Sequence, residues 1–550
     1  MHEISPAKSR TFLFVLTLLC LLPFVGKAFH IDDPCYVWVA KHIVEHPLDP
    51  YRFSVIWFNT EMPMSYVINH PPLVSYYIAA VGSWAGWSEY ALHLAFVLPA
   101  LVVVLGVYQL AVELTGLPLL AGVITLCAPG FLVSSTGLMT EVPMLALWMV
   151  AIIFWRRGLN EEKALYLPGG GLLIGACALS NYFGASLIPL LFLYSLLKKQ
   201  RLGSWVLYLL IPVAILVGYQ QWTLSMYGHG MLSYIAPYLN QGRADHAKSF
   251  WGASIVGLAF VGGCTLPALT CMPWLWRRPF IFGSCIAAAI GTAAAAYGRF
   301  NVGTPLPHQQ EGFLEVQLLL FIVGGISVLA LAISDVWRRD ADSVFLAAWV
   351  IGPFVAAYLN WSVNARVVLP LIPATAILMA RRLELVQRPQ SLALWKLIAP
   401  LVVSALLSLW IAWGDLTLAN SAREAAQIIH DKTASQPGRV FFFGHWGFQY
   451  YMQSLGAQPM DLAHIKVDVG DLIVQPQNNT NVPPVPVDLI SSSEVIELQD
   501  HCWIATLSTD RAAGFYSSVL GMMPYTLGSV PDERYVLIRL RSPHSAAAAR

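Results

Sequence analysis

Two adjacent carboxylates, Asp32 and Asp33, directly follow the first long apolar run of the chain, residues 11–29. About 20 apolar residues cross a bilayer core as a helix, so this run is expected to be the first transmembrane helix. Charges at the mouth of such a helix are costly unless they face water, a partner or an ion. One carboxylate could act as a general base while the other orients it or holds a metal, and their proximity would raise one pKa. The alternative is an acidic pair that caps a helix or shapes a loop.

A histidine, His70, stands before Pro71 and Pro72 late in the same polar segment, residues 30–90. The segment is long for a chain with few other loops, and long ordered loops are usually functional. His70 could bind a divalent metal or a phosphate group, or the His-Pro-Pro sequence could only shape a turn.

The composition is that of a polytopic membrane protein. Of 550 residues, 57% are hydrophobic and 11% are charged, with a mean hydropathy of +0.60. Soluble domains carry about 25% charged residues. The formal net charge of +1 argues against nucleic-acid binding, which needs a basic surface. The eight cysteines have neither metal-like spacing nor the pattern of a disulfide framework.

We therefore expect an all-α polytopic membrane protein with about 13 transmembrane helices. Residues 168–182 and 184–197 are short for spans and form either two tilted helices or one re-entrant hairpin. The thirteen candidate spans are 11–29, 91–113, 117–134, 138–155, 168–182, 184–197, 204–224, 250–274, 279–297, 312–334, 343–360, 366–380 and 394–413.

Lysine and arginine indicate the orientation. They concentrate in alternate loops, such as 156–163, 198–201, 277–278 and 338–339, which should be cytoplasmic. The N-terminus is then cytoplasmic and the C-terminal residues are periplasmic, most simply in a bacterial inner membrane. This topology brings the outer ends of several spans, and the ionisable residues beside them, to one membrane face.

The last part of the chain loses the transmembrane pattern. We divide the chain into a membrane domain, 1–414, with its first external loop at 30–90, and a small extracytoplasmic α/β domain, 415–550. The elements expected in the second domain are helices over 418–434 and 446–455 and strands over 439–443, 502–507 and 535–540.

Four motifs, in their order and spacing, resemble those of the GT-C glycosyltransferases, which include protein O-mannosyltransferases and lipid A aminoarabinose transferases. The resemblance covers residues 10–415 and does not extend to the tail. The motifs are Asp32-Asp33-Pro34-Cys35-Tyr36, His70-Pro71-Pro72-Leu73, Thr140-Glu141-Val142-Pro143, and Arg366 followed by Leu369-Pro370 and Pro373.

This resemblance implies transfer of a sugar, with inversion, from a polyprenyl-phosphate donor to a protein, lipid or glycan acceptor outside the cytoplasm. Asp32 would take the acceptor proton, Asp33 would assist it, and a divalent metal could bind Asp33 and His70. The expected role of Arg366, with His70 and Tyr182, is to contact the donor phosphate. For Glu141 and Tyr36 it is to line the acceptor or metal side. Arg366 could instead be an interfacial arginine, and Glu141 a simple helix-terminal charge.

Three positions depart from the aminoarabinose-transferase pattern. Asp33 stands where relatives have glutamate, Asn69 stands where they have glutamate, and Asn181 replaces a lysine before Tyr182. The metal site and the phosphate contacts of the aminoarabinose transferases therefore cannot be transferred completely to this chain. The acceptor can also differ from theirs.

Two other functions remain open. A lipid-linked glycan ligase or polymerase would transfer a preassembled chain instead of one sugar. A polysaccharide flippase or transporter would need ionisable groups near the middle of the membrane, and the spans carry few.

Overall fold

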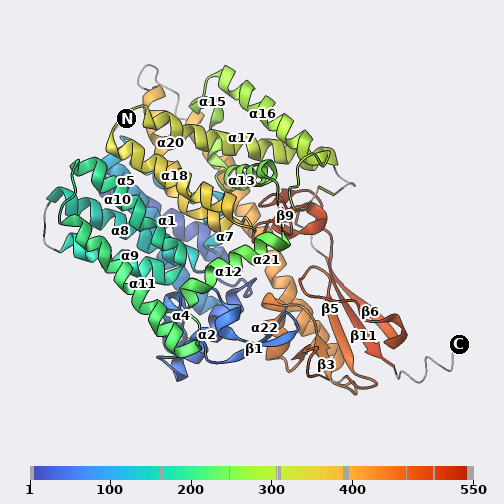
Figure 1. Ribbon diagram of the computed structural model, residues 1–550. Helices are drawn as coiled ribbons and strands as arrows, with labels where there is room; N and C mark the ends of the chain where they lie inside the picture. The colour runs from blue at the N-terminus through green and yellow to red at the C-terminus, as the bar shows by residue number, and fades with distance from the viewer. Residues whose placement is uncertain are drawn as a thin grey trace.

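The computed structural model describes residues 5–541 except 162, 164, 247, 305, 308–310, 388–394, 466, 500 and 501. Its larger part is helical, and a five-stranded sheet projects from the helices at the lower right of Figure 1. This confirms a mostly helical membrane protein with a C-terminal α/β region. The placement of that region outside the cytoplasm stays a prediction.

Eight helices of the described residues are long and apolar enough to cross a membrane. A ninth span results if α12 (Met231–Asp245) and α13 (Phe250–Cys264), which meet at a bend of 109°, count as one. The other expected spans fall on shorter or broken helices, so the number thirteen stays a prediction. The eight lie in α1 (Pro6–Leu21), α5 (Glu89–Leu114), α8 (Glu141–Glu161), α11 (Trp205–Tyr227), α16 (Arg278–Ala296), α17 (Glu311–Val336), α18 (Ala341–Leu359) and α21 (Trp395–Thr433).

Prolines interrupt three expected spans. Proline has no N–H to donate and fixes φ, so it is tolerated in the first turn of a helix and breaks the preceding one. The expected spans 168–182 and 184–197 are separated without a proline at their junction. They form α9 (Tyr166–Ser180) and α10 (Leu187–Lys199), joined by η2 (Tyr182–Ser186). Five pieces have proline as their first or second residue: α6 (Pro118–Leu126), α7 (Pro129–Ser134), α14 (Pro267–Thr270), α15 (Met272–Leu275) and η4 (Leu369–Leu371). The last of these lies between α19 (Ala365–Val368) and α20 (Ile372–Gln387).

The first external loop, expected as a loop over 30–90, contains regular elements. After η1 (Leu22–Phe24), helix α2 (Asp33–Glu45) begins with an acidic residue and Pro34 in its first turn, as helix starts commonly do. The hairpin β1 (Ser54–Trp57) and β2 (Thr60–Pro63) follows. Two helices, α3 (Met64–Val67) and α4 (Leu73–Ala85), complete the segment.

Helices α13 and α17 approach closely because glycines line their contact. A Cβ atom on Gly262 would lie 1.8 Å from the carbonyl oxygen of Phe321, and one on Gly325 would lie 2.3 Å from that of Leu258. Small residues let membrane helices pack backbone against backbone, where van der Waals contact is the main attraction. Substitution at either glycine would therefore push the two helices apart.

The C-terminal sheet has the strand order β4-β3-β5-β11-β6. Strand β3 pairs in parallel with both of its neighbours, whereas β11 pairs antiparallel with β5 and β6. The helices expected over 418–434 and 446–455 are the end of α21 and α22, and the strands expected over 439–443 and 535–540 are β3 and β11. The bounds are β3 (Val440–Phe442), α22 (Trp446–Ser454), β4 (Gln458–Pro459), β5 (Leu472–Pro476), η5 (Val487–Leu489), β6 (Ile490–Leu498) and β11 (Glu533–Leu540).

Residues 504–527 form a separate piece, which we call the C-terminal lobe, and it packs against the membrane helices. The Leu527 N–H donates to Oε1 of Gln317 on α17 at 2.7 Å, and the Tyr525 hydroxyl donates to the Gly263 carbonyl on α13 at 3.1 Å. The single strand expected over 502–507 is two short strands. The lobe contains β7 (Ile504–Ala505), β8 (Leu507–Ser508), η6 (Thr509–Arg511), β9 (Ala513–Gly514) and β10 (Thr526–Leu527).

The division of the chain at residues 414 and 415 falls inside α21, which continues from a membrane span into the C-terminal region without a break. The division into two domains stays a prediction. With the C-terminal lobe packed on α13 and α17, the two parts share an extensive contact.

Candidate active site

An ion pair joins the first external loop to a segment late in the membrane part. Asp32 stands directly before α2 and Arg366 lies in α19, and Nη1 of Arg366 is 3.2 Å from Oδ2 of Asp32. The side chain of Asp32 is 31% exposed, and it caps no backbone N–H of α2. The Asp32 carboxylate is therefore held by a cation, remains accessible, and is not required to hold the helix.

Glu141, at the start of α8, and His70 surround this ion pair. Glu141 and Asp32 are the strongest attractive charges on Arg366. Glu141 also acts on His70, whose pKa burial lowers below its ordinary value, so the neutral imidazole is favoured. Tyr36, buried on α2, has its ring centroid 6.2 Å from that of His70. The structure thus brings Asp32, Tyr36, His70, Glu141 and Arg366 together.

Four polar atoms of this cluster have no hydrogen-bond partner among the described residues. They are the hydroxyl of Tyr36, Nδ1 of His70, Oε2 of Glu141 and Nε of Arg366. Buried polar atoms are nearly always paired, and an unpaired one is costly. One donor on a guanidinium and one acceptor on a carboxylate are therefore available to a polar ligand at the same place.

The backbone at both sides of the ion pair is fixed by local structure. Ile31 has φ of 50°, a left-handed conformation that costs a β-branched residue on the order of 1–3 kcal/mol. On the other side, the Asn364 side chain accepts a hydrogen bond from the Val367 N–H at 2.9 Å and caps α19. The strained turn at Ile31 sets the direction of the Asp32 side chain. The cap at Asn364 orients α19, the short helix that carries Arg366.

Asp33 has a different environment from Asp32. It is 1% exposed, and its two oxygens accept hydrogen bonds from the backbone N–H groups of His30, at 3.0 Å, and Leu138, at 2.9 Å. Burial raises the pKa of Asp33 to about 7, and the neighbouring Asp32 contributes only the last of the causes. The expected mutual effect of the two carboxylates is thus minor, and Asp33 holds the strained turn to the segment before α8.

This raised pKa gives a testable pH dependence of stability. The folded-state pKa of Asp33 is about 7, against an ordinary value of 3.8, so Asp33 contributes stability that is fully present below pH 3.8. That contribution declines as pH rises and is lost as pH passes through about 7, by roughly 1.4 kcal/mol per pH unit at most. An Asp33→Asn protein should therefore show a flatter Tm across this window than the parent, by differential scanning fluorimetry in detergent. Identical pH profiles would refute the assignment.

Tyr182 belongs to a neighbouring cluster of tyrosines. Its hydroxyl donates to that of Tyr219 at 3.3 Å, and Tyr51, in the same cluster, donates to the His70 carbonyl at 2.8 Å. The preceding residue, Asn181, reaches the site itself, because its Nδ2 donates to Oε1 of Glu141 at 3.4 Å. Tyr51 therefore holds the backbone of His70, and a phosphate contact of Tyr182 stays a prediction.

A buried network that the sequence did not indicate lies beside the site. Nζ of Lys27 is 2.5 Å from Oδ2 of Asp415, and both side chains are fully buried. Asp415 also accepts hydrogen bonds from the Thr506 hydroxyl at 2.8 Å and the Tyr516 hydroxyl at 2.7 Å, both in the C-terminal lobe. A small cavity is lined by Lys27, Tyr516 and Arg366. The only signals in the sequence are single charges at the ends of two apolar runs.

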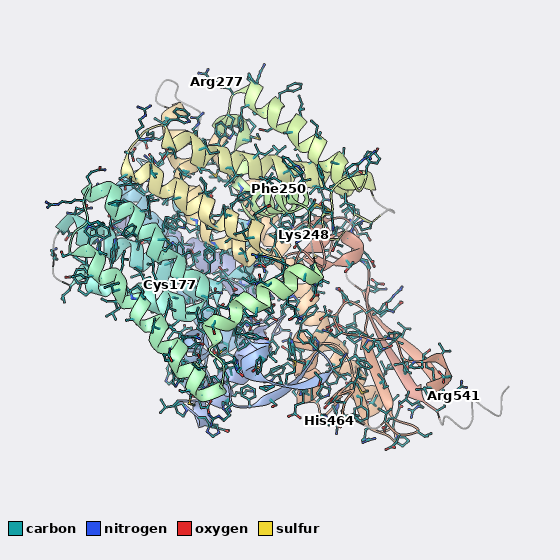
Figure 2. All side chains as sticks on the ribbon, in the orientation of Figure 1. Cys177, Lys248, Phe250, Arg277, His464 and Arg541 are labelled. Carbon is teal, nitrogen blue, oxygen red and sulfur yellow. The ribbon has the colours of Figure 1, made fainter. Side chains whose placement is uncertain are left out.

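The C-terminal lobe also holds the segment before Arg366. The Ser518 N–H donates to the Val363 carbonyl at 2.7 Å, and the Ser518 hydroxyl accepts from the Val363 N–H at 2.9 Å. Lys248 donates to the Ser518 hydroxyl at 2.9 Å, and burial lowers the pKa of this lysine to about 8. Figure 2 shows Lys248 where the lobe meets the helices. The lobe therefore holds the segment before Arg366 through Ser518. It also contacts Asp415, the partner of Lys27, through Tyr516.

The described residues contain no group of three or more His, Cys, Asp or Glu side chains placed to hold a metal ion. Both oxygens of Asp33 already accept backbone N–H groups. Binding of a divalent metal by Asp33 and His70 stays a prediction, and this arrangement does not favour it.

Residues 69–222 match the family described as dolichyl-phosphate-mannose-protein mannosyltransferase. The chain resembles the GT-C glycosyltransferases. Glycosyl transfer is the general activity that this resemblance supports. The matched residues include His70 and Glu141, whereas Asp32 and Arg366 lie outside them. Among curated protein sequences no match was found.

Solved structures that match this chain include three glycosyltransferases, all at TM-scores below 0.5. The oligosaccharyltransferase of Archaeoglobus fulgidus, solved with a tethered acceptor peptide, is 14% identical with a TM-score of 0.49, over 82% of this chain and 63% of that one. The present chain thus spans less than two thirds of its length. ArnT from Cupriavidus metallidurans, solved with undecaprenyl phosphate, is 14% identical with a TM-score of 0.42, over 86% and 94% of the chains. Arabinofuranosyltransferase AftD from Mycobacteria is 12% identical with a TM-score of 0.37, over 97% and 40%.

Proposed function

We propose that this protein is an inverting glycosyltransferase that moves a sugar from a polyprenyl-phosphate donor to an acceptor outside the cytoplasm. The observation that carries the proposal is the accessible carboxylate of Asp32 held 3.2 Å from the guanidinium of Arg366. The donor class follows the name of the matched family, whose members are described as using dolichyl-phosphate mannose. The acceptor is a protein, a lipid or a glycan.

Asp32 acts as the general base. The acceptor oxygen forms a bond to the anomeric carbon while the bond from that carbon to the phosphate oxygen breaks. The acceptor proton passes to Asp32, and the electron pair of the broken bond leaves with the lipid phosphate. Because the acceptor attacks from the side opposite the phosphate, the configuration inverts. Positioned proton transfer of this kind contributes about 10²-fold to 10⁴-fold in rate.

Arg366 stabilises the charge that develops on the leaving phosphate. A planar guanidinium presents several donors and suits phosphate oxygens. Its Nη1 atom faces Asp32, whereas Nε is unpaired among the described side chains. His70, with its free Nδ1, is the second phosphate contact, and Glu141 and Tyr36 line the acceptor side. The membrane is a bacterial inner membrane, with the site on its periplasmic face.

Shortening the cation at position 366 tests its role. An Arg366→Lys protein keeps the positive charge but loses the fork of donors, so we expect kcat/KM for the donor to fall about 10-fold to 10²-fold. The measurement is transfer at varied donor concentration, with the Tm recorded in parallel. Arg277→Lys, at an exposed position between α15 and α16, is the matched control and should have unchanged donor kinetics. Normal donor kinetics in Arg366→Lys would remove Arg366 from the phosphate site.

The decisive experiment uses purified protein in lipid nanodiscs with radiolabelled polyprenyl-phosphate hexoses and pentoses. Release or transfer of label that depends on Asp32 supports the proposal and identifies the sugar. Specific binding of a lipid-linked glycan without turnover of any donor would contradict it and favour a flippase or a ligase.

A further inference from the structure

A large open groove lies between the first external loop and α22, outside the site described above. Its volume is about 620 Å³, within the usual range of ligand sites. One wall is a face of α2, formed by Trp38, Lys41, His42 and Glu45. Figure 1 shows α2, β1 and α22 gathered at the lower edge of the molecule.

Aromatic rings form part of the walls of this groove. The rings of Trp38 and Tyr450 lie with their centroids 6.2 Å apart and their planes 33° from parallel. Nζ of Lys41 lies 5.4 Å from the Tyr450 ring centroid and 5.7 Å from that of Trp87. The ammonium group of Lys41 is therefore close to the rings of Tyr450 and Trp87 and helps to fix their positions. The groove therefore presents an apolar platform that is already ordered.

Polar groups that both donate and accept surround the platform. The side chains of Glu45, Glu61 and Gln453 line the groove and are exposed. Nε2 of His42 is buried and has no hydrogen-bond partner among the described residues. Carboxylates, an amide and an imidazole beside aromatic rings match the two kinds of surface on a sugar. The rings match its C–H faces, and the polar groups match its hydroxyls.

We propose that this groove is a saccharide-binding site distinct from the candidate active site. The four residues of α2 that line it follow the spacing i, i+3, i+4 and i+7 and so share one face of the helix. Tyr36, only two residues before Trp38, points about 200° away and is buried toward His70. The groove therefore holds a glycan on the outside of α2, and its occupation does not require glycosyl transfer.

An extended peptide is the other ligand that the shape admits, because β1 is an edge strand of a two-stranded hairpin. The Ile56 carbonyl on β1 already accepts a hydrogen bond from Nε2 of Gln449 at 3.0 Å. A peptide strand would lose that acceptor, whereas a saccharide contacts the rings and the rim and leaves it in place. The observations therefore favour the saccharide.

The test is calorimetric binding of mannotetraose, cellotetraose and chitotetraose to the full protein in nanodiscs, with no donor present. We expect at least one tetrasaccharide to bind. Glu61→Gln and Gln453→Ala, at exposed positions, should each weaken that binding about fivefold to tenfold. Trp38→Ala should abolish it, provided that its Tm is normal. Glu424→Gln, an exposed residue on α21, is the control and should bind as the parent does.

Failure of this proposal is separable from failure of the proposed function, because binding is measured without turnover. Asp32→Asn should bind the tetrasaccharide as the parent does, even though its sugar transfer is expected to be slow. Three outcomes would overturn the groove as a saccharide site. They are no binding of any tetrasaccharide up to about 10 mM, binding that both Glu61→Gln and Gln453→Ala leave unchanged, and binding of a serine-rich peptide in place of the sugars.

Discussion

Replacing Asp32 with asparagine is expected to lower sugar transfer about 10²-fold to 10⁴-fold without changing the Tm. The amide has the size of the carboxylate but cannot accept the acceptor proton. Folding should be retained because Asp32 is 31% exposed and caps no N–H of α2. The measurement is the single-turnover rate with saturating labelled donor, which separates the chemical step from product release.

Two comparisons isolate the effect of the base. Asp510→Asn, at an exposed position in the C-terminal lobe, removes one carboxylate elsewhere and should transfer at the parent rate. Donor binding by Asp32→Asn reports on Arg366, the other member of the ion pair. Without its 3.2 Å ion pair to Asp32, Arg366 becomes freer to bind the donor phosphate. Turnover of Asp32→Asn at the parent rate would exclude the general-base role.

The membrane topology alone was enough to predict that the candidate site residues lie at one face of the membrane. Asp32, His70, Glu141 and Arg366 stand at or beyond the ends of apolar runs that the alternating topology assigns to one membrane face. The structure brings these side chains together. What the sequence could not distinguish was Asp32 from Asp33. Adjacent residues at a helix start point about 100° apart, and only the tertiary contact with Leu138 shows which carboxylate is buried.

The sequence analysis did not predict the helix breaks at prolines, although the prolines that cause them stand in the sequence. The C-terminal lobe left no such signal. Pro129 and Pro267 each begin a new helix inside an expected span. The lobe has strands of two residues, which carry too few positions for a period of two to emerge. Its fold depends on contacts with α13, α17 and the segment before Arg366, and such pairings leave no local pattern in the sequence.

The C-terminal lobe contacts the segments that carry the Asp32–Arg366 ion pair. Val363 and Ala365, three residues and one residue before Arg366, form hydrogen bonds with Ser518 and Phe515 respectively. On the other side, Asp415 links Tyr516 to Lys27, five residues before Asp32. The lobe thus contacts the supports of both members of the Asp32–Arg366 ion pair, so its loss should separate them.

Removing one member of the Lys27–Asp415 pair is expected to destabilise the protein by about 3–5 kcal/mol, because the other charge is left buried without a partner. Lys27→Met should therefore lower the Tm markedly, and Asp415→Leu should do the same. The double variant should recover part of the loss, since two apolar side chains replace two buried charges. The recovery is incomplete because the hydroxyls of Thr506 and Tyr516 lose their acceptor. Unfolding in detergent, followed by fluorimetry, gives the coupling energy from a double-mutant cycle.

The exposed pair of Lys432 and Glu494, whose side chains are 43% and 59% exposed, is the matched control. Lys432→Met should change stability by about 0–1 kcal/mol, because solvent screens an exposed pair. If Lys27→Met were as mild as Lys432→Met, the buried pair would not join the lobe to the membrane part. A folded double variant with slow transfer would have a different meaning. It would show that the charges position Asp32 and Arg366 as well as stabilising the fold, because packing alone would then have failed to restore the geometry of the site.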